Sequence, residues 1–253
     1  MFFKICFILP ILIASFINSV PISSTNKALD KALWNVKDGK LISSWTEENI
    51  YLYAMDWKRA EEHDGVYREI VLSVRDHEKY FSCWQIDTNP VRKPTFNLSD
   101  INNDGKKELI VISTSGYGTG ILLQDVHVFR FDKEGFFYDI YVMDPREGIY
   151  QNIKGKLTKK DGIVTVTINI KGNDHTMTAK ESSLAYWGNE VGFGSVQEYK
   201  VIDNKLIAEM NIVVGNDVSI AVIVMEYVFE NGRLRVNNVT LKKHDSNWQK
   251  WNN

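Results

Sequence analysis

Apolar and polar residues alternate strictly over residues 164–170, Val-Thr-Val-Thr-Ile-Asn-Ile, and this pattern constrains the fold more than any other in the chain. A period of two puts alternate side chains on opposite faces of a β-strand. One face is therefore expected to be buried and the other to face water. The same period recurs from about residue 50 onward, with little sign of helix between the strands.

Turn-forming dipeptides separate these strand-like segments. Asp, Asn and Gly tolerate the positive φ angles that tight hairpins require. The firmest hairpin is expected at Asn231-Gly232, because residues 220–230 before it and 233–241 after it are rich in β-formers. The other dipeptides of this kind are Asp64-Gly65, Glu134-Gly135, Asp161-Gly162, Gly172-Asn173, Asp203-Asn204 and Gly215-Asn216.

Many strands with little helix between them predict a mainly β fold of antiparallel sheets, arranged as a sandwich, a barrel or a partial propeller. One short N-terminal helix is expected within residues 25–37, where Ala and Leu recur at helical spacing. Residues 24–253 suffice for one β-rich domain or for two subdomains with a boundary near 144–148. Residues 242–253 are expected to form a loose polar tail.

The start of the chain has the pattern of an export signal. Lys4 precedes an apolar run over residues 5–17, and small and polar residues follow it. A transmembrane anchor is the alternative, but the run is shorter than the roughly 20 residues that a bilayer core requires, and Pro10 interrupts it. We therefore expect residues 1–23 to be a signal peptide, and the protein to be secreted or on the cell surface, with no membrane span after cleavage.

Charge and cysteine content exclude some classes of partner. Removal of residues 1–23 takes away one lysine and no acid, which leaves 29 basic and 32 acidic side chains and a formal charge of −3. Nucleic acid is not expected as a partner, because binding phosphates requires a cationic face. Cys83 is then the only cysteine left, and its β-type neighbours favour a buried, inert thiol.

Residues 100–108, Asp-Ile-Asn-Asn-Asp-Gly-Lys-Lys-Glu, form an acidic loop that leads into the strand-like run 109–112. Oxygen-bearing side chains at its first, third and fifth positions, glycine at the sixth and an acid at the ninth suit a hard cation such as Ca²⁺. The alternative is an Asx-rich hairpin turn without a metal. The expected ligands of a structural Ca²⁺ ion are the side chains of Asp100, Asn102, Asp104 and Glu108 and the main-chain carbonyl of Lys106.

This loop is not an EF-hand loop, because its twelfth position is Val111 and a strand follows instead of a helix. Residues 95–113 instead resemble a single FG-GAP or VCBS-type repeat, whose Asp-x-Asp/Asn-x-Asp-Gly-x-x-Asp/Glu loop opens into a β-strand. The resemblance implies calcium binding and a ligand-binding protein that is secreted or on the cell surface. In that family several repeats usually form a propeller, whereas this chain contains one copy.

No catalytic constellation stands out. No two histidines have metal-ligand spacing, and the acid-rich segment Glu61-Glu62-His63-Asp64 is expected to be a solvated loop before a turn. Asp125 and His127 lie two residues apart on a probable strand and could act as an acid/base pair if their face lined a pocket. Residues 116–120, Gly-Tyr-Gly-Thr-Gly, are expected to connect two strands and could form a mobile rim beside the acidic loop.

Aromatic residues suggest a ligand of another kind. Tyr186-Trp187-Gly188-Asn189 is the best candidate for stacking on sugars, although aromatic residues in a β core are the more common case. The first hypothesis is thus a calcium-stabilised β-rich protein that binds a surface protein or glycan. A secreted hydrolase with dispersed acidic residues and a structural envelope protein are the alternatives.

Overall fold

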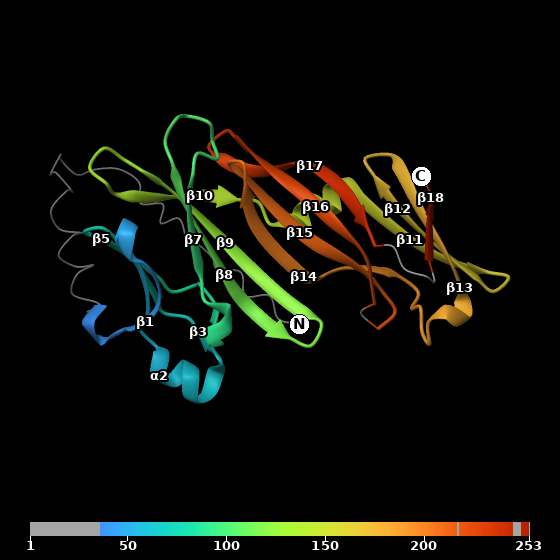
Figure 1. Ribbon diagram of the computed structural model, residues 1–253, viewed down its shortest axis with the longest axis horizontal. Coiled ribbons are helices and arrows are strands. Elements are labelled where there is room, and N and C mark those ends of the chain that lie inside the picture. Colours follow the sequence, from blue (N-terminus) through green and yellow to red (C-terminus); the bar gives the residue numbers. More distant parts are fainter. Residues whose placement is uncertain (1–35, 217, 245–248, 253) are drawn as a thin grey trace, which may run out of the picture. The chain divides into compact units, whose positions relative to one another are not determined.

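The computed structural model describes residues 36–216, 218–244 and 249–252 (Figure 1). It is 62% strand and 13% helical, so the prediction of a mainly β fold is confirmed. The chain divides into two compact units, Met1–Thr88 and Asn89–Asn253. The expected signal peptide lies outside the described residues, as does the expected helix except for residues 36–37, which belong to the 3₁₀ turn η1 (Val36–Asp38).

The first unit holds a four-stranded antiparallel sheet in the order β1-β2-β4-β5 and a two-stranded sheet of β3 and β6. In β2 the alternation of residues buries Ile50, Leu52 and Ala54 and leaves the two tyrosines between them half-buried. The strands are β1 (Lys40–Trp45), β2 (Ile50–Ala54), β3 (Val66–Tyr67), β4 (Ile70–Val74), β5 (His77–Phe81) and β6 (Ile86–Asp87). The helical segments after η1 are η2 (Thr46–Glu48), α2 (Trp57–Arg59) and the π-helix η3 (Ala60–Asp64).

The second unit contains an eight-stranded sheet in the order β10-β17-β16-β15-β14-β9-β8-β7 and a four-stranded sheet in the order β11-β12-β13-β18. The larger sheet consists of β7 (Thr95–Ser99), β8 (Glu108–Gly118), β9 (Ile121–Phe131), β10 (Phe137–Val142), β14 (Val191–Ile202), β15 (Lys205–Val214), β16 (Val218–Glu230) and β17 (Arg233–Lys243). The smaller sheet consists of β11 (Ile153–Lys160), β12 (Ile163–Ile170), β13 (Asn173–Lys180) and β18 (Gln249–Asn252). Its helical segments are η4 (Pro90–Arg92), α3 (Pro145–Asn152) and η5 (Glu181–Ser183).

Strand β9 has three partners. It pairs with β8 along one edge, while its other edge pairs with β14 near its start and with β10 near its end. Because β10 also pairs with β17, the ladder from β14 through β15, β16 and β17 returns to β9. The β9–β14 and β10–β17 pairings are parallel, whereas the other pairings of this sheet are antiparallel.

One hydrophobic core joins the two sheets of the second unit. Val166 and Ile168 of β12 belong to the same buried cluster as Met210 and Ile212 of β15 and Ile223 of β16. The alternation in residues 164–170 is confirmed, because its three apolar positions before Ile170 are fully buried and the polar positions between them are half-buried. Each such buried side chain stabilises the fold by roughly 1.5–3 kcal/mol.

Several of the predicted turn dipeptides lie where the chain reverses, but the β12–β13 turn is Lys171-Gly172, one residue before the predicted Gly172-Asn173. Asn231 and Gly232 have φ angles of 52° and 79°, and Glu230 pairs with Arg233, which confirms the long β16–β17 hairpin. Positive φ angles also mark the turns at Asp161-Gly162 and Asp203-Asn204. These residues are favoured there because most side chains resist that conformation.

The structure also describes part of the C-terminal tail and residues 144–148, two segments for which the sequence made predictions. The tail expected to be loose contains the end of β17 and all of β18, which pairs antiparallel with β13, so that prediction is wrong for residues 242–243 and 249–252. Residues 144–148 lie inside the second unit, where Asp144 caps the start of α3 and accepts a hydrogen bond from the backbone N–H of Arg146. Proline at the first position of α3 is favourable, because that position has no intrahelical partner for an N–H group.

Candidate functional site

The acidic loop, residues 100–108, joins β7 to β8 in the second unit. These strands are antiparallel, and their last register pair is Ser99 with Glu108, so the two ends of the loop lie side by side. Glu108 is the first residue of β8 and is only 1% exposed. The loop therefore has one carboxylate held in the sheet, at Glu108, whereas Asp100 is half-buried and Asp104 is exposed.

Asp100 organises the first half of the acidic loop. Its Oδ1 accepts a hydrogen bond from the backbone N–H of Asp104 at 3.0 Å, and its Oδ2 accepts one from Gly105 at 3.0 Å. Asn103 and Gly105 have φ angles of 59° and 83°, so the chain turns sharply at both positions. Short side chains that bond nearby backbone groups are typical of such turns.

Asn102 links the carboxylates of the acidic loop. Its Nδ2 donates to Oε1 of Glu108 at 2.6 Å and to Oδ2 of Asp104 at 3.2 Å, while its Oδ1 accepts from the backbone N–H of Asp104 at 2.8 Å. Two carboxylates from separate parts of the loop thus lie within hydrogen-bond distance of one nitrogen atom. Three of the predicted ligand residues, Asn102, Asp104 and Glu108, are therefore joined by hydrogen bonds.

The acidic loop concentrates negative charge. Burial raises the pKa of Glu108, and the Asp104 and Asp100 carboxylates raise it further, although a hydrogen bond from the Ile101 N–H opposes them. Within the described residues, no ion pair involves Asp100, Asp104 or Glu108. A bound cation would relieve this repulsion.

The donor set fits Ca²⁺ only if neutral oxygens take part. In the described part of the chain, no group of three or more His, Cys, Asp or Glu side chains is arranged to hold a metal ion. The expected set adds the Asn102 amide oxygen and the Lys106 carbonyl, which are ligands that Ca²⁺ accepts. To join the carboxylates, the Asn102 oxygen would have to exchange places with its nitrogen, which would break the bond from the Asp104 N–H.

A pocket of about 620 Å³ lies beside the acidic loop. The loop and the start of β8 contribute Asp104, Lys106, Lys107 and Glu108 to its wall. The end of β9 and the turn after it contribute Arg130, Phe131, Asp132 and Lys133, and β10 contributes Tyr138. These two groups meet because β8 and β9 are antiparallel, with Leu109 opposite Phe129.

The β9–β10 turn is fixed by Asp132. Its carboxylate accepts hydrogen bonds from the backbone N–H groups of Glu134 and Phe136 and from the Tyr138 hydroxyl, at 2.9–3.0 Å. Burial raises the pKa of Asp132, but these hydrogen bonds outweigh that effect and the pKa is lowered. The sequence predicts this turn at Glu134-Gly135, but its position near the acidic loop depends on the register between β8 and β9.

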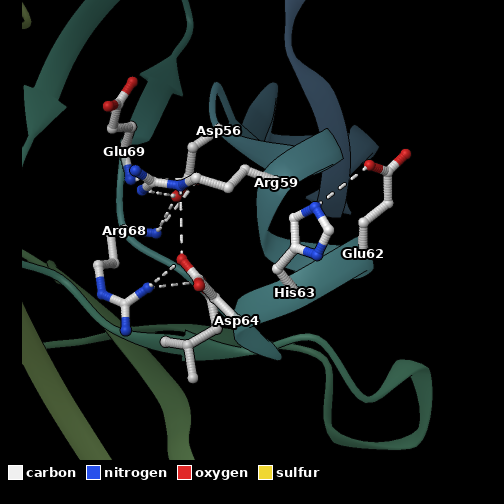
Figure 2. A network of polar contacts seen from close by, with 8 residues as sticks. Asp56, Arg59, Glu62, His63, Asp64, Arg68 and Glu69 are labelled. Carbon is white, nitrogen blue, oxygen red and sulfur yellow. Dashed lines mark hydrogen bonds and ion pairs between the residues drawn. The ribbon is translucent and has the colours of Figure 1, made fainter.

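The acid-rich segment of the first unit is structural. Residues 60–64 form the π-helix η3, so the expected solvated loop at residues 61–64 is wrong in conformation. Figure 2 shows His63 turned to Glu62, while the Asp56 and Asp64 carboxylates and the Arg59 and Arg68 guanidinium groups form a separate network. Asp64 pairs with Arg68 at 2.9 Å, and Asp56 accepts hydrogen bonds from the backbone N–H groups of Arg68 and Glu69.

Asp125 and His127 lie on one face of β9, as their spacing predicted. Burial raises the pKa of Asp125, although a hydrogen bond with Ser115 and the charge of Arg146 oppose this. Burial lowers the pKa of His127 to about 4. The pocket beside the acidic loop is lined by neither residue, so the condition set for an acid/base pair is not met there.

The glycine-rich run, residues 116–120, forms the far end of the β8–β9 hairpin. Gly118 is the last residue of β8, Gly120 has a φ angle of 73°, and β9 begins at Ile121. The predicted connection between strands is confirmed. The expected position beside the acidic loop is wrong, because the acidic loop lies at the start of β8 and the run at its end, with strand residues 109–115 between them.

Trp187 is buried, which is the more common case expected for an aromatic residue, whereas the prediction for Cys83 is wrong. Trp187 is 2% exposed and its indole N–H donates to the Glu181 carbonyl at 2.8 Å, so it presents no ring to a sugar, whereas Tyr186 is 52% exposed. Cys83 was expected to be buried but lies in an exposed bend between β5 and β6. The β-type neighbours of Cys83 did not reveal that strand β5 ends at Phe81.

The fold and the site together define a mainly β protein of two compact units with an acidic loop and an adjoining pocket in the second. Comparisons of the chain with family models, with curated proteins and with solved structures found no match. None of the helices in the described part of the chain is long and apolar enough to cross a membrane.

Proposed function

We propose that this chain is a secreted or cell-surface protein in which a structural Ca²⁺ ion in the acidic loop stabilises a β-rich, ligand-binding domain. The observation that carries the proposal is the gathering of the Asp104 and Glu108 carboxylates around the Asn102 amide, with Asp100 closing the same loop. The strand–loop–strand arrangement of residues 95–113 supports the resemblance to an FG-GAP or VCBS-type repeat.

The position of the acidic loop explains why an ion there would stabilise the domain. The loop closes the β7–β8 hairpin, and β7 is the edge strand of the eight-stranded sheet. An ion that binds Asp100 and Glu108 together would hold both ends of this hairpin. Extracellular calcium is about millimolar, so a site with a dissociation constant of about 10⁻⁴ M would be filled and would add about 1.4 kcal/mol to the free energy of unfolding.

Thermal melting of the chain from residue 24 onward, with calcium and with a chelator, tests the proposal. Calcium is expected to raise the Tm by about 3–6 °C, and Asp104→Ala is expected to abolish this rise. Asp132→Ala is the matched control, because Asp132 also bonds backbone N–H groups in a turn but lies outside the acidic loop. Its variant should melt lower than the wild type and keep the full calcium response.

A lack of calcium binding would contradict the proposal. If calcium leaves the Tm unchanged and calorimetric titration detects no heat of binding, the acidic loop is an Asx-rich turn without a metal. The proposed calcium function would then be rejected.

A further inference from the structure

We propose that the pocket beside the acidic loop binds a short anionic saccharide that carries sulfate or carboxylate groups. This inference rests on the proposed function, because export would expose the pocket to such saccharides and calcium would change its charge. The volume of about 620 Å³ lies within the range of sites for small ligands.

Four basic side chains supply the attraction for an anion. Lys106 and Lys107 come from the acidic loop, and Arg130 and Lys133 come from the end of β9 and the turn that follows. All four are exposed, and none forms an ion pair within the described residues. They remain available to a sulfate or carboxylate group.

Tyr138 and Asp132 favour a saccharide over a simple anion. The Tyr138 ring is 48% exposed, so it offers a face for the apolar side of a sugar ring. The Asp132 carboxylate is held in place by its turn and can accept further hydrogen bonds from sugar hydroxyl groups. A ligand that satisfies all these groups has negative charges, hydroxyl donors and an apolar face.

Calcium would tune the pocket. Its lining residues include four basic side chains and three acidic ones, Asp104, Glu108 and Asp132, which gives a net charge of +1. Two of these acids are expected calcium ligands. A divalent ion in the acidic loop would therefore raise the net charge to +3 and strengthen the binding of an anion.

The test is calorimetric titration of the chain from residue 24 onward with a heparin-derived tetrasaccharide and with tetragalacturonate. Maltotetraose serves as the neutral probe and inorganic phosphate as the simple anion. At least one anionic tetrasaccharide is expected to bind, while maltotetraose and phosphate are not. A chelator should weaken this binding by about five-fold, as expected for two charges near the pocket in water.

The double variant Arg130→Gln/Lys133→Gln is expected to bind the tetrasaccharide about ten-fold more weakly than the wild type. It leaves the acidic loop intact, so its Tm should still rise with calcium. Lys154→Gln/Lys156→Gln is the matched control, because it removes the same charge from exposed positions on β11, outside the pocket. This control should bind as tightly as the wild type.

The outcomes separate the two proposals. A protein that calcium stabilises but that binds neither anionic tetrasaccharide overturns the saccharide site and leaves the calcium function standing. Equal losses in both double variants would indicate attraction to overall charge and would also overturn the saccharide site. Phosphate that binds as tightly as the tetrasaccharides would overturn it in favour of a simple anion. Saccharide binding that depends on Arg130 and Lys133 without any calcium response supports the site and rejects the calcium function.

Discussion

The side-chain nitrogen of Asn102 lies 2.6 Å from Oε1 of Glu108 and donates a hydrogen bond to it. Without a cation, this amide is the donor that holds the acidic carboxylates of the loop together. With a cation, the same position would be better filled by an oxygen. An amide at residue 102 should therefore stabilise the acidic loop without calcium, whereas a carboxylate there should stabilise it with calcium.

Asn102→Asp is expected to show this reversal. In chelator the variant should lose about 2 kcal/mol of stability, because a hydrogen bond to a charged group is replaced by repulsion between carboxylates. In calcium the new oxygen should join the ion, so the calcium-induced rise in Tm should exceed that of the wild type. Melting curves in both conditions check this, and an unchanged calcium response would contradict the expected role of residue 102.

Acid should destabilise the second unit through His127. The folded-state pKa of about 4 lies below the ordinary value of about 6.5, so the stability gained by keeping the ring neutral is present above pH 6.5. It is lost as the pH falls from 6.5 to 4, by about 3 kcal/mol in total. His127→Gln removes this loss. Urea titrations should show that the free energy of unfolding falls less between pH 6.5 and pH 4 for the variant than for the wild type. Equal falls in the two proteins would contradict the prediction.

The turn between β15 and β16 should not tolerate a side chain at Gly215. A Cβ atom there would lie 2.0 Å from the Tyr186 carbonyl oxygen, and the φ angle is 58°. Gly215→Ala is therefore expected to cost about 2–4 kcal/mol. Gly232→Ala is the control, since its φ angle is 79° but nothing lies within 4 Å of the added atom. It should cost only about 1 kcal/mol in urea unfolding, and equal costs would show that contact with Tyr186 is unimportant.

The buried hydroxyl of Tyr227 ties β16 to the segment before α3. It donates to the Met143 carbonyl at 2.8 Å. Tyr227→Phe should lower the free energy of unfolding by about 1–2 kcal/mol, because the carbonyl would lose its partner in the interior. Tyr150→Phe changes a tyrosine that is 85% exposed and should stay within about 0.5 kcal/mol of the wild type. If Tyr227→Phe leaves the free energy of unfolding unchanged, water replaces the lost hydroxyl as the partner of the carbonyl.

Local features of the fold could be predicted because they depend on neighbouring residues alone. The alternation over residues 164–170 determines which side of β12 is buried, and Asn231-Gly232 adopts the positive φ angles that its hairpin requires. The acidic loop was visible for the same reason, because its oxygen-bearing side chains recur within nine consecutive residues.

Features that depend on distant pairing could not be predicted. The pocket combines Lys106 with Arg130 and Tyr138, and only the β8–β9 and β9–β10 registers bring these residues together. The division between Thr88 and Asn89 was likewise not predicted, because it depends on which strands pair with one another. The hydrogen bond from the Trp187 indole to the Glu181 carbonyl could not be predicted either, because both residues lie outside the strands.

The three partners of β9 affect how the chain must be made. Synthesis delivers β9 and β10 well before β14 and β17, which later cover their open edges. Until then the nascent chain presents unpaired strand edges that favour aggregation. The ladder that returns to β9 can therefore form only after residues 191–243 have been synthesised.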